Sequence, residues 1–321
     1  MDSIAALVEM IGSPILVVVG PTAAKKSKLG LRLAKDLGGE IVSADSMQVY
    51  RHFDIGTAKP TPEEIATVPH HIVDILEPNE LFSAARFIDL ADQAIKEIVS
   101  RGNLPVVVGG TCLYIRALLH GLFRAPANSL EIRAAHKEVA ARDGVAVLYE
   151  RLVEVDPIAA ERIDRNDFVR ISRGLEVHEQ TGARISDLQA VHNFLPNRYS
   201  AVQIGLNPNK AKLHEAIDRR TDKMMEIGWL DEVRSLLSAG YENTHPMGAL
   251  GYKQLLTHLR GELDLEESVR QTKRDTRRFA RRQRTWFVGE SGIHWFEEPD
   301  QVETNWVKGL FDRAIDLGQG K

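Results

Sequence analysis

The residues from Gly20 to Ser27 carry the clearest chemical signal in this sequence. They read Gly-Pro-Thr-Ala-Ala-Lys-Lys-Ser, directly after the apolar run Ile15 to Val19 and before a helical pattern. Backbone N–H groups at a helix N-terminus, a lysine and a hydroxyl group together favour a phosphate with its Mg²⁺ ion. We therefore predict a diphosphate- or nucleotide-binding loop in which Ser27 contacts Mg²⁺. Its residues are Gly20, Pro21, Thr22, Ala23, Ala24, Lys25, Lys26 and Ser27.

Lys25 departs from the usual phosphate-loop pattern, in which a glycine precedes the lysine and the hydroxyl residue. If the backbone there is left-handed, a residue other than glycine costs roughly 1–2 kcal/mol. The Lys25 side chain would then either occupy space needed by the phosphate or add positive charge to it. An ordinary strand-to-helix turn with two solvated lysines is the alternative to a phosphate site.

A second motif of nucleoside-triphosphate hydrolases is missing. Such enzymes place an aspartate at the end of an apolar strand to hold Mg²⁺. Here the strand expected at 105–108 runs into Gly109-Gly110, and the one at 202–206 has no acidic residue. A phosphate site without that aspartate indicates that the loop binds a diphosphate for another purpose.

Short apolar runs alternate with helical patterns over the first third of the chain. Strands are predicted at 15–19, 40–42 and 105–108, and helices at 29–37, 83–101 and from the Gly-Gly turn to 119. Strands separated by helices form right-handed crossovers and a parallel sheet. The predicted fold class is therefore α/β, with a parallel sheet core of the P-loop NTPase type.

The pattern changes near Gly121. Residues 126–190 are helical and charged, and the run from Tyr199 to Leu206 then returns to strand character. Further helices are predicted at 210–239 and 265–288. We predict one core interrupted by a helical insertion, in which residues 1–121 and 191–321 form the core and residues 122–190 form the insertion.

The amino-acid composition excludes several classes of protein. The 321 residues include 41 Lys and Arg against 45 Asp and Glu, a formal net charge of −4, so overall charge does not indicate a polyanionic partner. The single cysteine, Cys112, excludes an internal disulfide and a Cys-x-x-Cys zinc site. No apolar run reaches the roughly 20 residues of a membrane span, and the N-terminus lacks a signal-peptide pattern. We expect a cytoplasmic enzyme or binding protein without a membrane partner.

Beyond the phosphate loop, a set of short motifs follows in order along nearly the whole chain. They are Asp45-Ser46-Met47-Gln48-Val49-Tyr50-Arg51, Asp54-Ile55-Gly56-Thr57-Ala58-Lys59-Pro60, His70-His71-Ile72-Val73-Asp74-Ile75, Ser83-Ala84-Ala85-Arg86-Phe87, Gly109-Gly110-Thr111-Cys112-Leu113-Tyr114, Asn166-Asp167 with Arg170 and Arg173, Leu175-Glu176-Val177, Gly251-Tyr252-Lys253-Gln254, and Arg281-Arg282-Gln283 with Thr285-Trp286. Their order and spacing resemble those of the tRNA dimethylallyltransferase (tRNA isopentenyltransferase) family.

The resemblance implies transfer of a dimethylallyl group from dimethylallyl diphosphate to N6 of adenosine 37, next to the anticodon of a tRNA, giving N6-(dimethylallyl)adenosine. It also implies Mg²⁺ as cofactor and an inserted helical domain that closes on the anticodon stem-loop. We expect a monomer. The phosphate loop would then hold the diphosphate leaving group, which agrees with the missing hydrolase motif.

The resemblance assigns catalytic roles to Asp45, Thr111 and Arg220. An exocyclic adenine amine is a poor nucleophile, so a carboxylate has to accept its proton as the C–N bond forms, and Asp45 follows a strand at the edge that faces the ligand crevice. Thr111 matches a threonine that contacts the target nucleotide. Arg220 matches an arginine near the diphosphate, where a planar cation stabilises charge on the leaving group. The structural alternatives are helix caps for Asp45 and Thr111 and a solvated surface arginine for Arg220.

The resemblance also implies RNA contacts. The expected residues are Asp45, Ser46, Met47, Gln48, Thr111, Arg133, Val169, Arg170, Ile171, Ser172 and Arg173. Because the adenine must leave its stack to reach the diphosphate, it has to be extruded into a pocket, at a cost of a few kcal/mol. The chain departs from the family at Val169, where glutamine is usual, and at Cys112, where glycine is usual. We interpret Cys112 as a packed thiol rather than a nucleophile.

Residues 270–284 form a basic segment. Eight basic residues stand against the single acidic Asp275, and positions 270, 274, 277, 278, 281 and 282 recur at helical spacing. Such a stripe suits a nucleic-acid backbone, so we expect Arg274, Arg278 and Arg281 to contact tRNA. A solvated charged helix face is the alternative. Phe279, Trp286 and Phe287 are interpreted as core residues rather than as stacking platforms.

Three other functions stay open at this point. An adenylate isopentenyltransferase acting on a free nucleotide would need neither the insertion nor the basic helix. An RNA-binding protein of the same fold with weakened catalysis would explain Lys25, Cys112 and Val169. A phosphotransferase is disfavoured by the missing aspartate-ended strand. His70 and His71, without a third ligand at suitable spacing, are weak evidence for a metal site.

Overall fold

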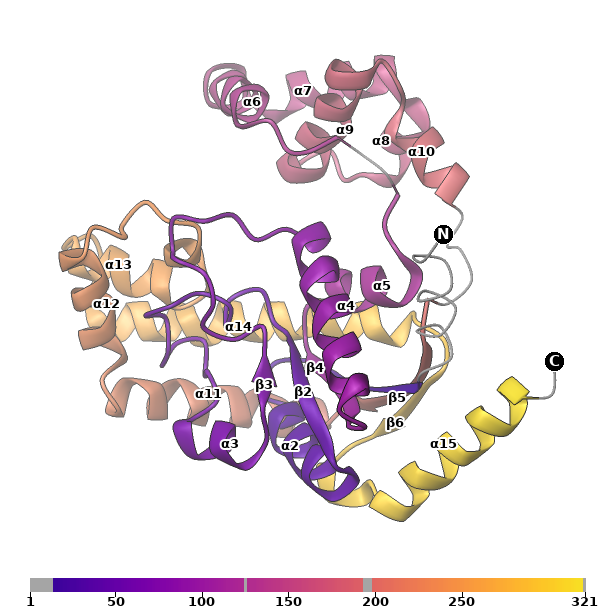
Figure 1. Cartoon of the computed structure of the whole chain (residues 1–321). Helices are drawn as coiled ribbons and strands as arrows, with labels where there is room; N and C mark the ends of the chain where they lie inside the picture. Colours follow the sequence, from indigo (N-terminus) through magenta and orange to yellow (C-terminus); the bar gives the residue numbers. More distant parts are fainter. Residues whose placement is uncertain (1–13, 124–125, 193–197, 320–321) are drawn as a thin grey trace. The chain divides into compact units, whose positions relative to one another are not determined.

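The computed structural model describes residues 14–123, 126–192 and 198–319 (Figure 1). The chain divides into two units, one formed by residues 1–119 and 197–321 and the other by residues 120–196. In the described ranges, none of the helices is long and apolar enough to cross a membrane.

The first unit is built on one six-stranded parallel sheet with the order β3-β2-β4-β1-β5-β6. The strands are β1 (Pro14–Val19), β2 (Gly39–Ala44), β3 (His70–His71), β4 (Leu104–Gly109), β5 (Ser200–Leu206) and β6 (Ile293–Phe296). Every neighbouring pair runs parallel. The α/β fold with a P-loop-type parallel sheet is confirmed. β1 lies in the interior of this sheet, between β4 and β5, so the loop that follows β1 lies between the loops that follow its neighbours.

Helices connect the strands of this sheet. They are α2 (Lys26–Leu37), α3 (Pro62–Thr67), α4 (Ala84–Ser100), α5 (Cys112–His120), α11 (Lys210–Glu226), α12 (Trp229–Ser238), α13 (Tyr252–Leu259), α14 (Leu265–Val288) and α15 (Thr304–Gln319), with 3-10 turns η1 (Pro246–Gly248) and η2 (Pro299–Gln301). Figure 1 shows α4 and α5 on one side of the sheet and α2 and α15 on the other.

Alternate residues of β1 face two separate cores. Ile15, Val17 and Val19 pack in one hydrophobic cluster with buried residues of α4, α5 and α12 to α14. Leu16 and Val18 pack in the other with α2 and α15. A central parallel strand covered on both faces has to be apolar throughout, which explains the unbroken run from Ile15 to Val19.

The predicted elements and the observed ones differ mainly at short or interrupted segments. The helix predicted at 210–239 is two helices, because Gly228 has φ 99° and ends the continuous turn between α11 and α12. The strands β3 and β6 were not predicted, since they have only two and four residues. The long helix predicted at 265–288 is confirmed as α14.

The second unit is helical throughout its described residues. It contains α6 (Leu130–Asp143), α7 (Val145–Val155), α8 (Pro157–Arg162), α9 (Phe168–Thr181) and α10 (Ile185–His192). Leu148, Leu152, Ile171 and Leu175 are buried together in a core of its own. The charged helical stretch predicted from 126 to 190 therefore forms an independent cluster of helices.

Candidate active site

A cavity of about 430 Å³ lies at the carboxyl ends of β1, β2 and β4. This edge is where parallel α/β sheets place their ligands. Thr22, Ala23, Lys26 and Ser27 line it after β1, Asp45 to Gln48 after β2, and Gly109 to Thr111 at the end of β4. Its other walls come from residues 56–58, from α11, from residues 248–252 and from α14. The cavity therefore unites the predicted phosphate loop with Asp45, Thr111 and Arg220.

The backbone of the predicted phosphate loop is left-handed at Lys25, so the condition stated for the cost of a residue other than glycine is met. Lys25 has φ 65° and Ala23 has φ 63°. The Lys25 ammonium pairs with Glu298 Oε2 at 2.9 Å, and about half of the Lys25 side chain is exposed. Lys25 is not among the residues that line the cavity, and its assignment to diphosphate binding stays a prediction. The ion pair with Glu298, which precedes η2, directs the side chain elsewhere.

Lys26 lies in the cavity wall at the start of α2. Its Nζ donates to the carbonyl of Pro21 at 2.8 Å. Burial, followed by the positive charge of Arg220, lowers the pKa of Lys26 to about 8, while Asp45 and Cys112 oppose that shift. The positive charges of Lys26 and Arg220 together favour an anionic ligand, because a bound phosphate would compensate both of them.

Arg220 reaches the phosphate loop from α11. Its Nη1 donates to Thr22 Oγ1 at 3.3 Å, and the residue lines the cavity. Burial lowers the pKa of Arg220, and the negative charge of Asp45 opposes that shift. The alternative of a solvated surface arginine is therefore excluded. The neighbouring Arg219 instead is exposed and pairs with Glu215 within the same helix.

Asp45 directly follows β2 and does cap a turn. Its Oδ1 accepts from the backbone N–H of Met47 at 2.8 Å and of Gln48 at 3.3 Å. Among the described residues no donor contacts the other oxygen, Oδ2. The capping contact and a catalytic role are compatible, because one oxygen orients the carboxylate while the residue still lines the cavity.

Thr111 joins the loop after β4 to the loop after β2. Its Oγ1 accepts from the backbone N–H of Ser46 at 3.2 Å, and its carbonyl accepts from Tyr114 N at 2.9 Å at the start of α5. Thr111, Ser46, Met47 and Gln48 all line the cavity. The hydroxyl hydrogen of Thr111 stays available to a ligand, because its oxygen acts as the acceptor in the contact with Ser46.

Gln283 on α14 is a site residue that sequence reasoning missed. Its Oε1 accepts from Thr22 N at 2.8 Å, and its Nε2 donates to the Gly110 carbonyl at 2.8 Å. The side chain is 5% exposed. The signal that could have identified Gln283 is an uncharged polar residue on the predicted buried face of an otherwise basic helix. Gln283 fixes the spacing between the phosphate loop and the loop after β4.

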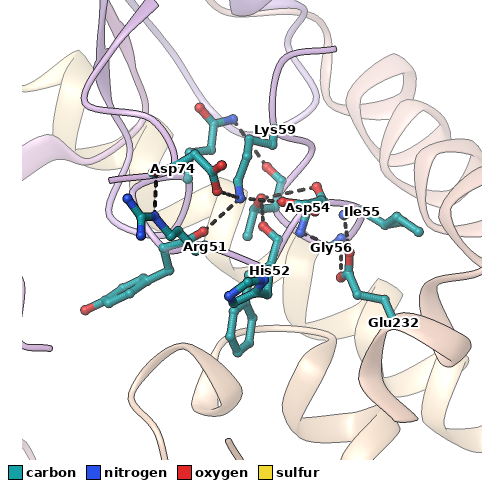
Figure 2. A network of polar contacts seen from close by, with 12 residues as sticks. Arg51, His52, Asp54, Ile55, Gly56, Lys59, Asp74 and Glu232 are labelled. Carbon is teal, nitrogen blue, oxygen red and sulfur yellow. Dashed lines mark hydrogen bonds and ion pairs between the residues drawn. The ribbon is translucent and has the colours of Figure 1, made fainter. Parts of the chain in front are cut away.

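A network of polar contacts holds the cavity-lining segment 56–58 in place (Figure 2). The side chain of Lys59 is only 8% exposed and pairs with Asp54 and, at 2.7 Å, with Asp74. Its Nζ also donates to the Tyr50 carbonyl at 2.8 Å. Gln48 Nε2 donates to the Ala58 carbonyl at 3.0 Å, which ties the segment to the loop after β2.

Glu232 on α12 anchors the other end of that segment. Its carboxylate accepts from the backbone N–H groups of Asp54 at 2.9 Å and Ile55 at 2.6 Å, and from the hydroxyl of Tyr252 at 2.6 Å. Figure 2 shows Glu232 beneath the turn formed by residues 54–56. This contact could not be predicted from local sequence patterns, because 178 positions separate Glu232 from Asp54.

The basic helix α14 is partly neutralised by acidic neighbours. Lys273 pairs with Asp222 of α11 at 2.6 Å, and Arg277 pairs with Asp218 of the same helix. Two of the predicted tRNA-binding residues, Arg274 and Arg278, share Asp275. The third, Arg281, is exposed and has no acidic partner among the described residues. The stripe therefore presents less free charge than its sequence predicted.

The aromatic residues of α14 differ in burial. Phe287 is 1% exposed and belongs to the core, as predicted. Phe279 is 36% exposed and lines the cavity. Its interpretation as a core residue is wrong, because it lies at the margin of the buried face of the helix, where the cavity replaces packed side chains.

Several residues expected to contact tRNA are engaged inside the helical unit. Arg133 contacts Glu176 at 3.0 Å and Arg173 contacts it at 2.6 Å, and the Glu176 side chain is fully buried. Ile171 and Ser172 are also buried, so their side chains are not available to a surface ligand. Val169 is 72% exposed, and Arg170 is exposed beside Asp167 at 3.5 Å.

Cys112 and the histidine pair have structural partners. Burial raises the pKa of the Cys112 thiol to about 12, so it is not an activated nucleophile. His70 Nδ1 contacts the Val68 carbonyl at 2.8 Å, and His71 Nε2 contacts Glu40 at 2.7 Å. No group of three His, Cys, Asp or Glu residues suited to a metal occurs in the part of the chain that the structure describes.

The fold is an α/β fold with a P-loop-type parallel sheet, and residues of the predicted phosphate loop line the same cavity as Asp45. The family model described as IPP transferase matches residues 48–290. The chain is 49% identical over 301 residues to "tRNA dimethylallyltransferase 2" of Syntrophus aciditrophicus, which covers 94% of this chain and 97% of that protein. This chain therefore belongs to the IPP transferase family, and the resemblance of its motifs is confirmed.

Solved structures agree with this assignment. The full-length tRNA isopentenylpyrophosphate transferase from Bacillus halodurans is 38% identical, with a TM-score of 0.69, and the match covers 96% of this chain and 99% of that one. A eukaryotic dimethylallyltransferase acting on tRNA is 26% identical, with a TM-score of 0.75, and covers 96% of this chain and 79% of that chain.

Proposed function

We propose that this protein transfers a dimethylallyl group from dimethylallyl diphosphate to N6 of adenosine 37 in a tRNA. The observation that carries the proposal is that Asp45 lines the same cavity as the phosphate loop in a member of the IPP transferase family. The reaction forms a bond between N6 and the allylic carbon. It breaks the bond between that carbon and the diphosphate oxygen, and the amine loses one proton.

Asp45 accepts that proton in the proposed reaction. Its Oδ1 is oriented by Met47 N and Gln48 N, which fixes the carboxylate without neutralising it. A correctly placed carboxylate contributes about 10²–10⁴-fold as a general base. Thr111, which is linked to the Asp45 loop through Ser46 N, orients the nucleotide through its free hydroxyl hydrogen.

The diphosphate leaves into a site with two partly buried cations. Lys26 and Arg220 both line the cavity, and burial together with the positive charge of Arg220 lowers the pKa of Lys26. The negative charge that develops on the leaving group compensates them, so their stabilisation grows as the allylic C–O bond breaks. The backbone N–H groups at the start of α2 add further donors to the diphosphate.

Mg²⁺ fits this donor set as a cation bound largely by the substrate. The hydroxyl of Ser27 lines the cavity at the lysine-hydroxyl end of the loop. Mg²⁺ is commonly held by one or two protein oxygens together with phosphate oxygens and waters. Ser27 would supply the protein oxygen, and the ion would neutralise part of the diphosphate charge.

The tRNA is held by sequence-independent contacts and by the helical unit. Arg281 at the exposed side of α14 provides free positive charge for the phosphate backbone. We assign the clasping of the anticodon stem-loop to residues 120–196, with the exposed Val169 and Arg170 as surface contacts. The protein acts as a cytoplasmic monomer in this proposal.

A label-transfer experiment tests the function. The protein is incubated with labelled dimethylallyl diphosphate, Mg²⁺ and either a tRNA with adenosine at position 37 or AMP. The proposal expects label in the tRNA and none in AMP. Label in AMP would instead identify a free-nucleotide isopentenyltransferase, and tight tRNA binding without transfer would identify a binding protein.

A further inference from the structure

Phe279 is an aromatic ring at the boundary between the cavity and the basic helix surface. It lines the cavity together with Asp45 and the phosphate loop, yet 36% of it is exposed. The adjacent Ala280 is buried, so Phe279 lies at the edge of the buried face of α14. Part of the Phe279 side chain is therefore accessible to a ligand at the cavity.

Arg282 lies about one helical turn after Phe279 on α14 and contacts its ring. Its guanidinium carbon is 5.8 Å from the centre of the Phe279 ring, within the range of a cation–π contact. Arg282 also lines the cavity and is exposed, and it has no acidic partner among the described residues. By contrast, Lys273 and Arg277 on the same helix are paired with α11. Charge is therefore left free next to the ring.

We propose that Phe279 and Arg282 form a stacking site for an unstacked nucleobase of the acceptor RNA. Planar bases stack on aromatic rings and on guanidinium planes, and such stacking does not require specific hydrogen bonds to the base. Arg282 would also contact the phosphate next to that base. The inference rests on the proposed function for its ligand, and it adds residues that hold the RNA base at the cavity.

The dimethylallyl chain is the competing occupant of the ring. An apolar chain gains nothing from an exposed guanidinium, whereas a base and its phosphate use both groups. The same cavity offers the apolar side chains of Met47, Met224 and Leu250 at positions away from α14 in the sequence. The contact between Phe279 and Arg282 on α14 therefore favours an RNA base over the dimethylallyl chain as the ligand of this ring.

A thermodynamic cycle tests the stacking site. The dissociation constants of wild type, Phe279→Ala and Phe279→Tyr are measured with an anticodon stem-loop RNA. Matching RNAs carry an abasic site at the acceptor adenosine or at either neighbour. We expect Phe279→Ala to weaken binding of the intact RNA about tenfold, with Phe279→Tyr near wild type. In the RNA that lacks the stacked base, Phe279→Ala should no longer weaken binding relative to wild type. The position of that abasic site identifies the stacked base.

Two results would overturn the stacking site. One is an equal Phe279→Ala loss, or no loss, for all four RNAs. The other is a fall in affinity for dimethylallyl diphosphate without a fall for pyrophosphate, which would assign the ring to the prenyl chain. Val288→Ala, at a 56% exposed position of the same helix, is the matched control and should bind like wild type.

The Arg282→Gln variant tests the second member of the site. We expect it to reduce the salt dependence of RNA binding by about one ion, because one phosphate contact is lost. An unchanged salt dependence would remove Arg282 from the site. Wild-type label transfer is measured separately, so a protein that binds RNA through Phe279 without transferring label would contradict the proposed function and leave the stacking site intact.

Discussion

The side-chain oxygen of Gln283 accepts a hydrogen bond from the backbone N–H of Thr22 at 2.8 Å. The amide of the same side chain donates to the Gly110 carbonyl at 2.8 Å. One residue of α14 thus bridges the loops that follow β1 and β4. The helix that carries the free arginine charges is directly connected to the loop that we assign to the diphosphate.

Replacing Gln283 by Met should separate these loops with little change in side-chain volume. Both hydrogen bonds would be lost, and each buried group left unsatisfied costs about 1–3 kcal/mol. We expect kcat/KM for label transfer to fall at least about tenfold. Steady-state kinetics with Thr285→Ala, at an exposed position of the same helix, provides the control. Wild-type kinetics in Gln283→Met would show that the bridge is dispensable.

The backbone at Lys25 can be tested by comparing Lys25→Gly with Lys25→Ala. Both variants lack the ion pair with Glu298, but only alanine retains the penalty of φ 65°. We expect the glycine variant to be more stable than the alanine variant by about 1 kcal/mol in urea unfolding. Equal stability would mean that this position is not left-handed in solution.

Lys26 should make diphosphate binding depend on pH. Its pKa is lowered to about 8 by burial and by Arg220 in the ligand-free protein. Above that pH a growing fraction of Lys26 is neutral, so binding of dimethylallyl diphosphate has to take up a proton and weakens. Calorimetric titration between pH 7 and about 10 should show this decline. Lys26→Arg, which keeps its charge, should show a flatter profile, and identical profiles would contradict the assignment.

Glu40 on β2 should control stability at low pH. Hydrogen bonds from Arg101, and further ones from Asn103 and His71, lower its pKa from 4.5 to about 2 against an opposing effect of burial. Because the pKa of Glu40 is lower in the folded protein than in the unfolded chain, its ionised carboxylate stabilises the fold at pH values above 4.5, by up to about 3 kcal/mol. This stabilisation is lost as the pH falls from 4.5 towards 2. Urea unfolding should show the gap between wild type and Glu40→Gln closing over that range. A constant gap would contradict this.

The sequence could predict the parts of the site that depend on local patterns. The phosphate loop follows from an apolar strand, a glycine and a lysine-hydroxyl pair, and the motif shows that Lys25 stands where a glycine is usual. The bounds of α14 follow from a basic pattern at helical spacing. These features need no knowledge of distant neighbours.

Other features depended on contacts between distant segments. The partner of Lys25 is Glu298, and the anchors of the turn at Asp54 and Ile55 come from Glu232 on α12. The exposure of Phe279 depends on the cavity beside α14 rather than on the helix pattern. The burial of Ile171 and Ser172 likewise depends on how the helices of the second unit pack.

Single-turnover label transfer by Asp45→Asn tests whether Asp45 is the general base. Asparagine keeps an oxygen for Met47 N and Gln48 N, so the turn should remain and tRNA affinity should change by less than about twofold. We expect the rate of transfer from dimethylallyl diphosphate to tRNA to fall by about 10²–10⁴-fold. Transfer at a near-normal rate in this variant would contradict the assignment of Asp45 as the general base.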